Sequence, residues 1–191
     1  MELNLISPCN TLGYGYTGLN ILKGLSPDVS YFPIGRPDVT TQEDFDIVSA
    51  AIENAKLFDH KAPCIRIWHQ HDMSQFVGSG MKIGFPIFEL DKFDHFERHH
   101  LETVDRLFVC SQWAKDVVLD QTYLKEDQVR VVPLGVDTEL FKPAPPNSYK
   151  TTVFFNCGKW EVRKGHDILA QAFNAAFDES DNVELWMMCD N

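Results

Sequence analysis

The sequence predicts an α/β protein in which helices flank a parallel β-sheet. Short apolar runs alternate along the chain with segments of helical period, which is typical of parallel strands connected through helices. Hydrophobic residues make up 44% of the chain and charged residues 24%, a globular composition that excludes global disorder. With 191 residues, the chain is long enough for one domain and part of a second.

The apolar runs predict strands, and the amphipathic stretches between them predict helices. The predicted strands are Leu3–Ser7, Val29–Ile34, Cys64–Trp68, Lys82–Leu90, Arg106–Cys110, Val129–Pro133, Thr152–Cys157 and Val183–Met188. The predicted helices are Leu19–Leu25, Asp44–Phe58, Phe93–His100, Ser111–Leu119 and Lys164–Phe177. Ser111 is the expected N-cap of its helix.

A proline-rich stretch divides the chain. Residues 138–150 contain three prolines and no periodicity, so they are predicted to form an interdomain linker. We expect a complete lobe over residues 1–137 and the beginning of a nucleotide-binding lobe over residues 151–191. The second lobe is expected to be incomplete, because only a strand, a helix and a further strand come after the linker.

Acidic residues outnumber basic ones by 28 to 17, which gives a net charge of −11. This field repels nucleic acid, so general nucleic-acid binding is excluded and any anionic ligand needs a local group of cations. The five cysteines include no CxxC pair, which predicts buried, reduced thiols. No signal peptide and no apolar stretch of about 18 residues is visible, and we expect a cytoplasmic protein without a transmembrane segment.

The segment Gly13–Gly18 comes directly after the first predicted strand and its loop, and it reads GYGYTG. Its glycines predict a tight turn, and the backbone amides at the start of the next helix suit a phosphate. The spacing also matches the dinucleotide fingerprint GxGxxG, although the nearest carboxylate after the second strand is Asp38, beyond a proline-containing turn. A phosphate-facing loop, a structural turn and NAD(P) binding all stay open.

Two histidines come after the third predicted strand, at the edge where ligands gather in open α/β sheets. His69 and His71 are two apart on an extended segment and are expected to face the same side, with Gln70 facing away. They are candidates for acid–base or acceptor contacts, and ordinary hydrogen-bonding histidines are the alternative. A metal site would need a third ligand such as Asp72 or a histidine of the segment 95–100.

Glu89 ends the apolar run of the fourth predicted strand, on the same edge of the sheet. Partial desolvation there would suit the carboxylate to acid–base work. The alternative is a surface carboxylate ahead of the next helix.

A basic segment lies between the strand and the helix of the second lobe. Gly158–Gly165 contains Lys159, Arg163 and Lys164 close to a helix N-terminus. Such cations can neutralise a diphosphate and stabilise it as a leaving group. A solvated basic loop is the alternative.

Three segments of the chain occur in a familiar order. They are Asp105–Trp113 (DRLFVCSQW), Val129–Pro143 (VRVVPLGVDTELFKP) and Gly158–Gly165 (GKWEVRKG). They resemble the "D-x-h-h-h-x-S-x-W/F", "V-x-V-I-P-N-G-V-D-x-x-x-F-x-P" and "G-R-x-x-x-x-K-G" segments of retaining GT-B glycosyltransferases of the family 4 type. The chain is therefore similar to that family, most strongly from Asp105 onward.

The resemblance implies a Rossmann-like acceptor lobe and, after it, a donor lobe that binds a nucleotide-diphosphate sugar. It implies sugar transfer to an acceptor hydroxyl with retention, with no tightly bound cofactor and no obligatory metal. The family's basic pair binds the donor diphosphate: Lys164 matches its lysine, whereas Lys159 stands where arginine is usual. Gly13 and Gly15, with Tyr16, correspond to the loop that faces the donor phosphates.

The resemblance also assigns the catalytic candidates. The family often has a histidine near the transferred sugar, and Glu89 takes that place here. His69 and His71 would line the acceptor side. The family's acidic segment, which holds the donor sugar, would lie beyond residue 191, so we expect a chain truncated within the donor lobe.

Two other functions remain open at this point. The chain could be a non-catalytic fragment or a binding or assembly module, with an incomplete lobe whose apolar strand faces favour self-association. It could also be a dinucleotide-dependent oxidoreductase, on the strength of the glycine segment alone.

Overall fold

The structure, a computed structural model, describes residues 2–143 and 150–190 and divides into two compact units. Unit 1 extends to Gly135, and unit 2 begins at Val136. Part of the predicted linker, residues 144–149, lies outside the described residues.

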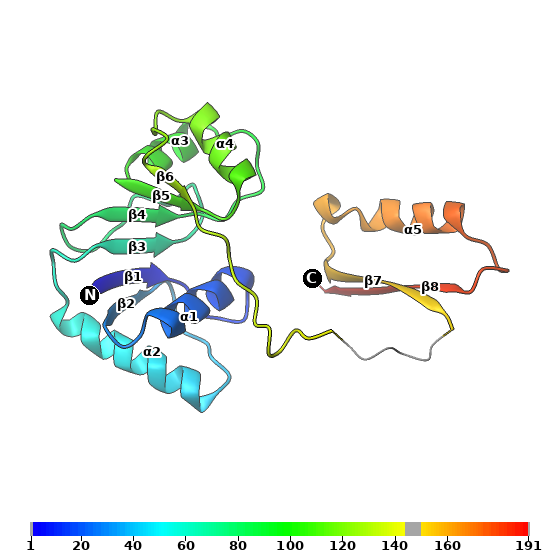
Figure 1. The fold of residues 1–191 in the computed structure, drawn as a ribbon, viewed down its shortest axis with the longest axis horizontal. Coiled ribbons are helices and arrows are strands. Elements are labelled where there is room, and N and C mark those ends of the chain that lie inside the picture. Colours follow the sequence, from blue (N-terminus) through cyan, green and yellow to red (C-terminus); the bar gives the residue numbers. More distant parts are fainter. Residues whose placement is uncertain (1, 144–149, 191) are drawn as a thin grey trace. The chain divides into compact units, whose positions relative to one another are not determined.

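Unit 1 is built on a six-stranded sheet in the order β2-β1-β3-β4-β5-β6 (Figure 1). The strands are β1 (Leu3–Ser7), β2 (Val29–Pro33), β3 (Cys64–Ile67), β4 (Lys82–Phe85), β5 (Arg106–Val109) and β6 (Val129–Val131). All neighbouring strands pair in parallel, which confirms the predicted fold class. The strands therefore all end at the same side of the sheet, which we call the carboxyl edge.

Four helices pack on this sheet. They are α1 (Gly13–Leu25), α2 (Gln42–Asn54), α3 (His95–Glu102) and α4 (Gln112–Gln121), and α2 continues into a 3₁₀ turn, η1 (Ala55–Leu57). Helices α1 and α2 pack beside β1 and β2, whereas α4 packs beside β5 and β6 (Figure 1). Ser111 caps α4 as predicted, since its Oγ accepts a hydrogen bond from the amide of Ala114.

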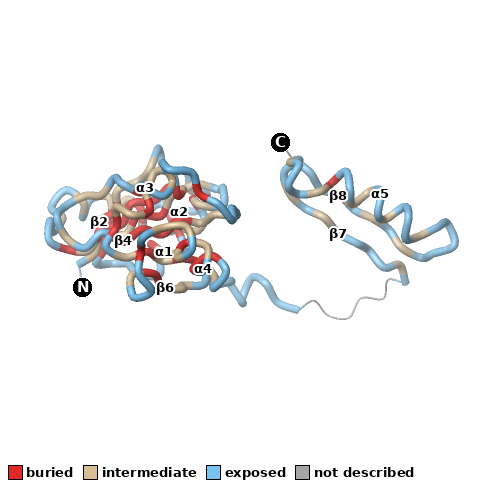
Figure 2. The backbone as a smooth tube through the Cα atoms, turned by 90° about the horizontal axis from the view of Figure 1, so that it is seen from above, coloured by how far each residue is buried: buried red, intermediate tan, exposed pale blue. Residues whose placement is uncertain are grey.

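The core of unit 1 consists of two apolar clusters. One lies around Leu5, Leu22 and Tyr31, and the other around Leu107 and Val118. Figure 2 shows the buried residues along the strands and helices of this unit. The two clusters hold the sheet and its helices together, and the loops at the carboxyl edge are built on them.

The fourth strand is shorter than predicted. β4 ends at Phe85 rather than at Leu90, because the next residue is Pro86, which has no amide hydrogen for the strand ladder. The backbone of Ile87 then forms its hydrogen bonds with the hydroxyl of Tyr14 instead of with a neighbouring strand.

The first helix begins earlier than predicted, at Gly13 instead of Leu19. The segment expected to be a glycine loop is therefore helical. Gly15 and Gly18 are buried where α1 crosses the segment after β1, and a Cβ on Gly18 would lie 2.4 Å from the carbonyl oxygen of Pro8. These two glycines permit close packing of the helix, which propensity alone does not reveal.

Unit 2 contains one βαβ element. It comprises β7 (Thr152–Lys159), the 3₁₀ turn η2 (Val162–Lys164), α5 (His166–Ala176) and β8 (Val183–Asp190), and β7 pairs with β8 in parallel. Among its described residues, His166 is the only buried one, and Figure 2 shows unit 2 almost entirely exposed or half-buried.

All five cysteines are free thiols. Cys9 and Cys64 are buried as predicted, and burial raises the pKa of both thiols. Cys157 and Cys189 are exposed, so the prediction of buried thiols is wrong for these two. They lie on the strands of unit 2, where most residues of both strands are exposed or half-buried.

No helix in the described part of the chain is both long and apolar enough to cross a membrane.

Candidate functional site

The first turn of α1 and the loops after β3 and β4 meet at the carboxyl edge around Tyr14. The ring of Tyr14, in the first turn of α1, lies 4.6 Å from the ring of His69 and 5.4 Å from that of Trp68, both after β3. Its hydroxyl donates to the carbonyl oxygen of Ile87, after β4, at 2.5 Å and accepts from the amide of Ile87 at 3.0 Å. Sequence reasoning missed Tyr14, because its partners are brought to it only by the parallel sheet.

His69 and His71 lie on the same side of their loop, as predicted. Their rings stack at 5.1 Å with an angle of 11° between them. Gln70 points the other way and donates to Glu97 on α3 at 2.8 Å. Burial, and then the nearby His71, lower the pKa of His69, while Asp72 has the opposite effect. His69 is therefore a neutral imidazole at pH 7.

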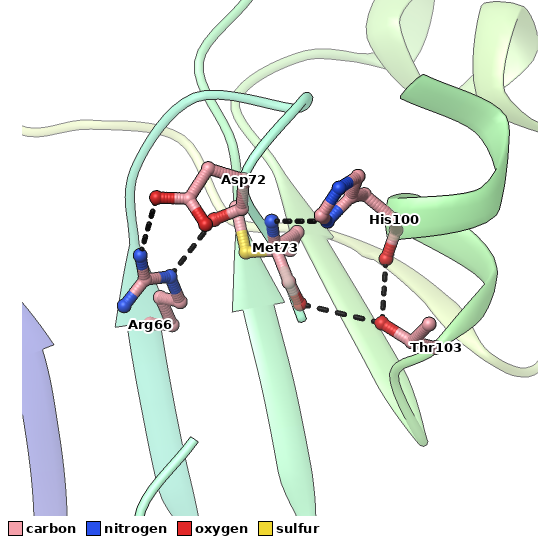
Figure 3. Close-up of polar contacts among 5 residues, drawn as sticks. All are labelled: Arg66, Asp72, Met73, His100 and Thr103. Atoms are coloured by element: carbon pink, nitrogen blue, oxygen red, sulfur yellow. Dashed lines mark hydrogen bonds and ion pairs between the residues drawn. The ribbon is translucent and has the colours of Figure 1, made fainter. Parts of the chain in front are cut away.

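The loop that carries these histidines is fixed from both sides (Figure 3). Arg66, buried on β3, donates to the backbone oxygen of Asp72 at 2.9 Å and to its carboxylate at 2.8 Å. On the other side, the amide of Met73 donates to Nδ1 of His100 at 3.3 Å, and Thr103 donates to the carbonyl oxygen of His100 at 2.7 Å. These hydrogen bonds hold the backbone of the loop that carries His69 in one position.

The same contacts affect the predicted alternative of a metal site at His69 and His71. His100 and Asp72, which were considered as third ligands, are engaged in bracing the loop. Across the described residues, no three side chains of the His, Cys, Asp or Glu type are arranged to hold a metal ion.

Glu89 lies two residues beyond Ile87 and is exposed. The expected partial desolvation of Glu89 is therefore wrong, because β4 ends before it and the apolar run does not enclose it. Its negative charge is the smallest of the causes that raise the pKa of Tyr14. Phe88, the residue between Ile87 and Glu89, packs on Phe93 at 5.0 Å and on Trp113 of α4 at 6.0 Å. These contacts connect the loop after β4 to the start of α4.

The first turn of α1 presents backbone amides without a side-chain cap. The N-cap is Leu12, no acidic residue lies in the first turn, and Gly13 and Tyr16 are exposed. A helix start of this kind carries partial positive charge. Gly15 is buried, and a Cβ there would lie 2.3 Å from the amide nitrogen of Asn10, so packing accounts for that glycine.

The basic loop of unit 2 presents its two candidate lysines to solvent. Lys159 ends β7 and Lys164 ends η2, and both are exposed. Arg163, by contrast, forms an ion pair with Glu161 at 3.0 Å. A Cβ added to Gly158 would lie 4.0 Å from Cε of Lys164, so the lysine side chain passes close to this glycine.

His166 organises this loop and was missed from the sequence. It is 3% exposed, its Nε2 lies 2.8 Å from the carbonyl oxygen of Lys159, and its ring stacks on Trp160 at 5.0 Å. Because a carbonyl oxygen only accepts, Nε2 carries the hydrogen. The contact fixes the backbone of Lys159 relative to the start of α5.

The structure therefore brings His69 and His71 together and carries Glu89 on the loop after the neighbouring strand β4. The donor-side candidates lie separately within each unit. A comparison with protein families identifies the family to which this arrangement belongs. The family model Glycosyltransferase Family 4 matches residues 25–140, which is more than half of the chain. The chain belongs to Glycosyltransferase Family 4. No curated protein and no solved structure matches it.

The matched range of this Family 4 protein contains every strand of the six-stranded sheet except β1, and it contains the candidates His69, His71 and Glu89. It contains neither the first turn of α1 nor the basic loop of unit 2. The family assignment thus rests on the lobe that carries the histidine loop, and it supports a glycosyltransferase function in general terms.

Proposed function

We propose that this Family 4 protein is a retaining glycosyltransferase that moves a sugar from a nucleotide-diphosphate donor to an acceptor hydroxyl. The observation that carries the proposal is the family match over the lobe in which Tyr14 contacts His69 at the carboxyl edge and the loop after β4 carries Glu89. In open α/β sheets this edge is where ligands bind.

The acceptor lies at the histidine loop in this proposal. His69 is neutral at pH 7, so an unprotonated ring nitrogen can accept a hydrogen bond from an acceptor hydroxyl. His71 stacks beside it, and Glu89 carries an exposed carboxylate on the loop after the neighbouring strand β4. The bracing through Arg66 and His100 keeps the histidine loop in one geometry.

Lys159 and Lys164, both in the basic loop of unit 2, bind the donor diphosphate in this proposal. In the reaction, the bond between the sugar's anomeric carbon and the diphosphate oxygen breaks, and a bond to the acceptor oxygen forms on the same face. The acceptor proton passes to the departing diphosphate. The lysine charges stabilise the negative charge that develops on the leaving group, so the proposed reaction needs no metal ion.

The oxidoreductase alternative is less well supported. All three glycines of the GxGxxG match lie inside α1, since the helix begins at Gly13. Two of them, Gly15 and Gly18, are buried against residues of the segment that follows β1, so neither presents open backbone to a ligand. This geometry does not form the glycine turn of a dinucleotide site.

A ligand-binding experiment separates these two functions. The complete gene product is heated with each of a panel of nucleotide-diphosphate sugars, and in parallel with NAD(H). We expect at least one nucleotide sugar to raise Tm, since a ligand at 100 times its Kd stabilises the folded state by about 2.7 kcal/mol. NAD(H) fluorescence is expected to stay unchanged. A response to NAD(H) with none to any nucleotide sugar would overturn the proposal.

We also propose self-association through unit 2, because one face of its sheet is apolar and open. Phe154 packs on Phe173 and Phe177, so α5 covers that face, and Phe155 points to the opposite one. Phe155 pairs in register with Trp186, and their exposed fractions are 62% and 55%.

Light scattering over a range of concentrations tests this association. We expect the mean mass to rise with concentration and Phe155→Glu to suppress the rise. Leu57→Glu, a similar change at an exposed position of unit 1, is the control and should leave the rise intact. A monomer at every concentration would refute self-association.

A further inference from the structure

Tyr14 connects three segments that are far apart in the sequence. Its hydroxyl is hydrogen-bonded to both backbone groups of Ile87, 73 residues away, and its ring contacts Trp68 and His69. The side chain therefore joins the first turn of α1 to the loops after β3 and β4.

The contact with Ile87 takes the place of strand pairing. Pro86 ends β4, so the amide and carbonyl groups of Ile87 have no partner in the sheet. A half-buried backbone group without a hydrogen bond is costly, and one hydroxyl both donates and accepts here. Phenylalanine could fill the same space but would leave both groups of Ile87 unpaired.

The contact with His69 completes the support of that ring. Behind the loop, Arg66 holds Asp72 and His100 holds Met73 (Figure 3). On the ring itself, Tyr14 packs edge-on at 4.6 Å, and Trp68 packs at 4.7 Å. The orientation of the imidazole is thus set by Tyr14 and Trp68 together with the stacked ring of His71, and the position of its backbone by the loop contacts.

We propose that Tyr14 is a positioning residue of the acceptor site, which sets the orientation of His69 and the path of the Ile87–Glu89 loop. This inference rests on the proposed glycosyltransferase function. Tyr14 does not touch the reacting atoms. It acts by holding the imidazole and the backbone of the Ile87–Glu89 loop in fixed positions, and a displacement of about 1 Å in such a site costs on the order of 10²-fold in rate.

The protonation state of Tyr14 agrees with this role. Burial raises the pKa of Tyr14 to about 12, and the nearby Cys110 and Glu89 also raise it, although the hydrogen bond to Ile87 opposes this. The hydroxyl therefore keeps its proton at physiological pH and remains a donor to the carbonyl oxygen of Ile87.

The test compares Tyr14→Phe with wild type in the complete gene product. Hydrogen exchange at the Ile87 amide is expected to accelerate in the variant, because its acceptor is gone. We expect kcat/KM for the acceptor to fall by on the order of 10-fold to 10²-fold, with the KM for the donor unchanged. Tyr123→Phe is the matched control, since Tyr123 is 93% exposed beyond the C-terminal end of α4, and it should alter neither measurement.

The outcomes are distinct. Faster exchange at Ile87 with unchanged acceptor kinetics would overturn the positioning role while leaving the proposed function intact. An equal loss for donor and acceptor would also overturn it, because that pattern indicates general loss of structure. If wild type transfers no sugar from any donor, the proposed function fails and this inference fails with it, whatever the exchange at Ile87 shows.

Discussion

Lys164→Ala is expected to lower kcat/KM for sugar transfer on the order of 10²-fold, the effect of removing one charge-stabilising group from a reaction of this kind. Lys164 is exposed at the end of η2, directly before the start of α5, and its ammonium forms no ion pair with the described residues. Its charge is therefore available for a diphosphate. Steady-state kinetics of nucleoside diphosphate release by the complete gene product would measure the effect.

Two further variants define what the lysine does. Lys164→Arg keeps the charge and is expected to retain most of the activity. Lys125→Ala removes a charge from an exposed position in unit 1 and should leave the rate within about twofold, because screened surface charges act weakly at a distance. A rate for Lys164→Ala equal to that of Lys125→Ala would remove Lys164 from the proposed mechanism.

Gly18→Ala is expected to lower the free energy of unfolding by about 1–3 kcal/mol, the usual cost of forcing an extra group into a packed contact. The added Cβ would lie 2.4 Å from the carbonyl oxygen of Pro8 and 2.5 Å from Oγ of Ser7. The helix would have to move away from the end of β1, and this shift would also displace Tyr14. Urea denaturation provides the measurement.

Gly24→Ala is the control in the same helix, with the opposite expected sign. Nothing lies within 4 Å of a Cβ at Gly24, so alanine adds no clash and increases helix stability by roughly 0.5–1 kcal/mol. If both variants were equally stable, α1 would not pack on Ser7 and Pro8 as described.

The strands were largely predictable, because their signal lies within each segment. Leu3–Ser7 is a short apolar run whose pairing partners repeat the same pattern, and its predicted bounds are confirmed. The strand starting at Lys82 was predicted too long, because the path of the chain after Phe85 depends on a remote residue: Ile87 bonds to Tyr14. The start of α1 was misplaced for a similar reason, since its glycines are selected by tertiary packing.

The residues of the candidate site were likewise predictable only where the sequence signal is local. His69 and His71 could be found from two local rules, the alternation of side chains and the position after a strand. Tyr14 and His166 could not be found this way, because each is defined by a contact with the backbone of another element. Glu89 was predicted at the end of a strand, but it lies in the loop after β4, and its exposure depends on where β4 ends.

Sugar transfer itself tests the central claim most directly. The complete gene product is incubated with each nucleotide-diphosphate sugar and a panel of hydroxyl acceptors, and the products are analysed by mass spectrometry and by NMR of the anomeric centre. We predict one donor that yields free nucleoside diphosphate and a glycosylated acceptor with the donor's anomeric configuration. Binding of a nucleotide sugar without transfer to any acceptor, or a product with inverted configuration, would contradict the account.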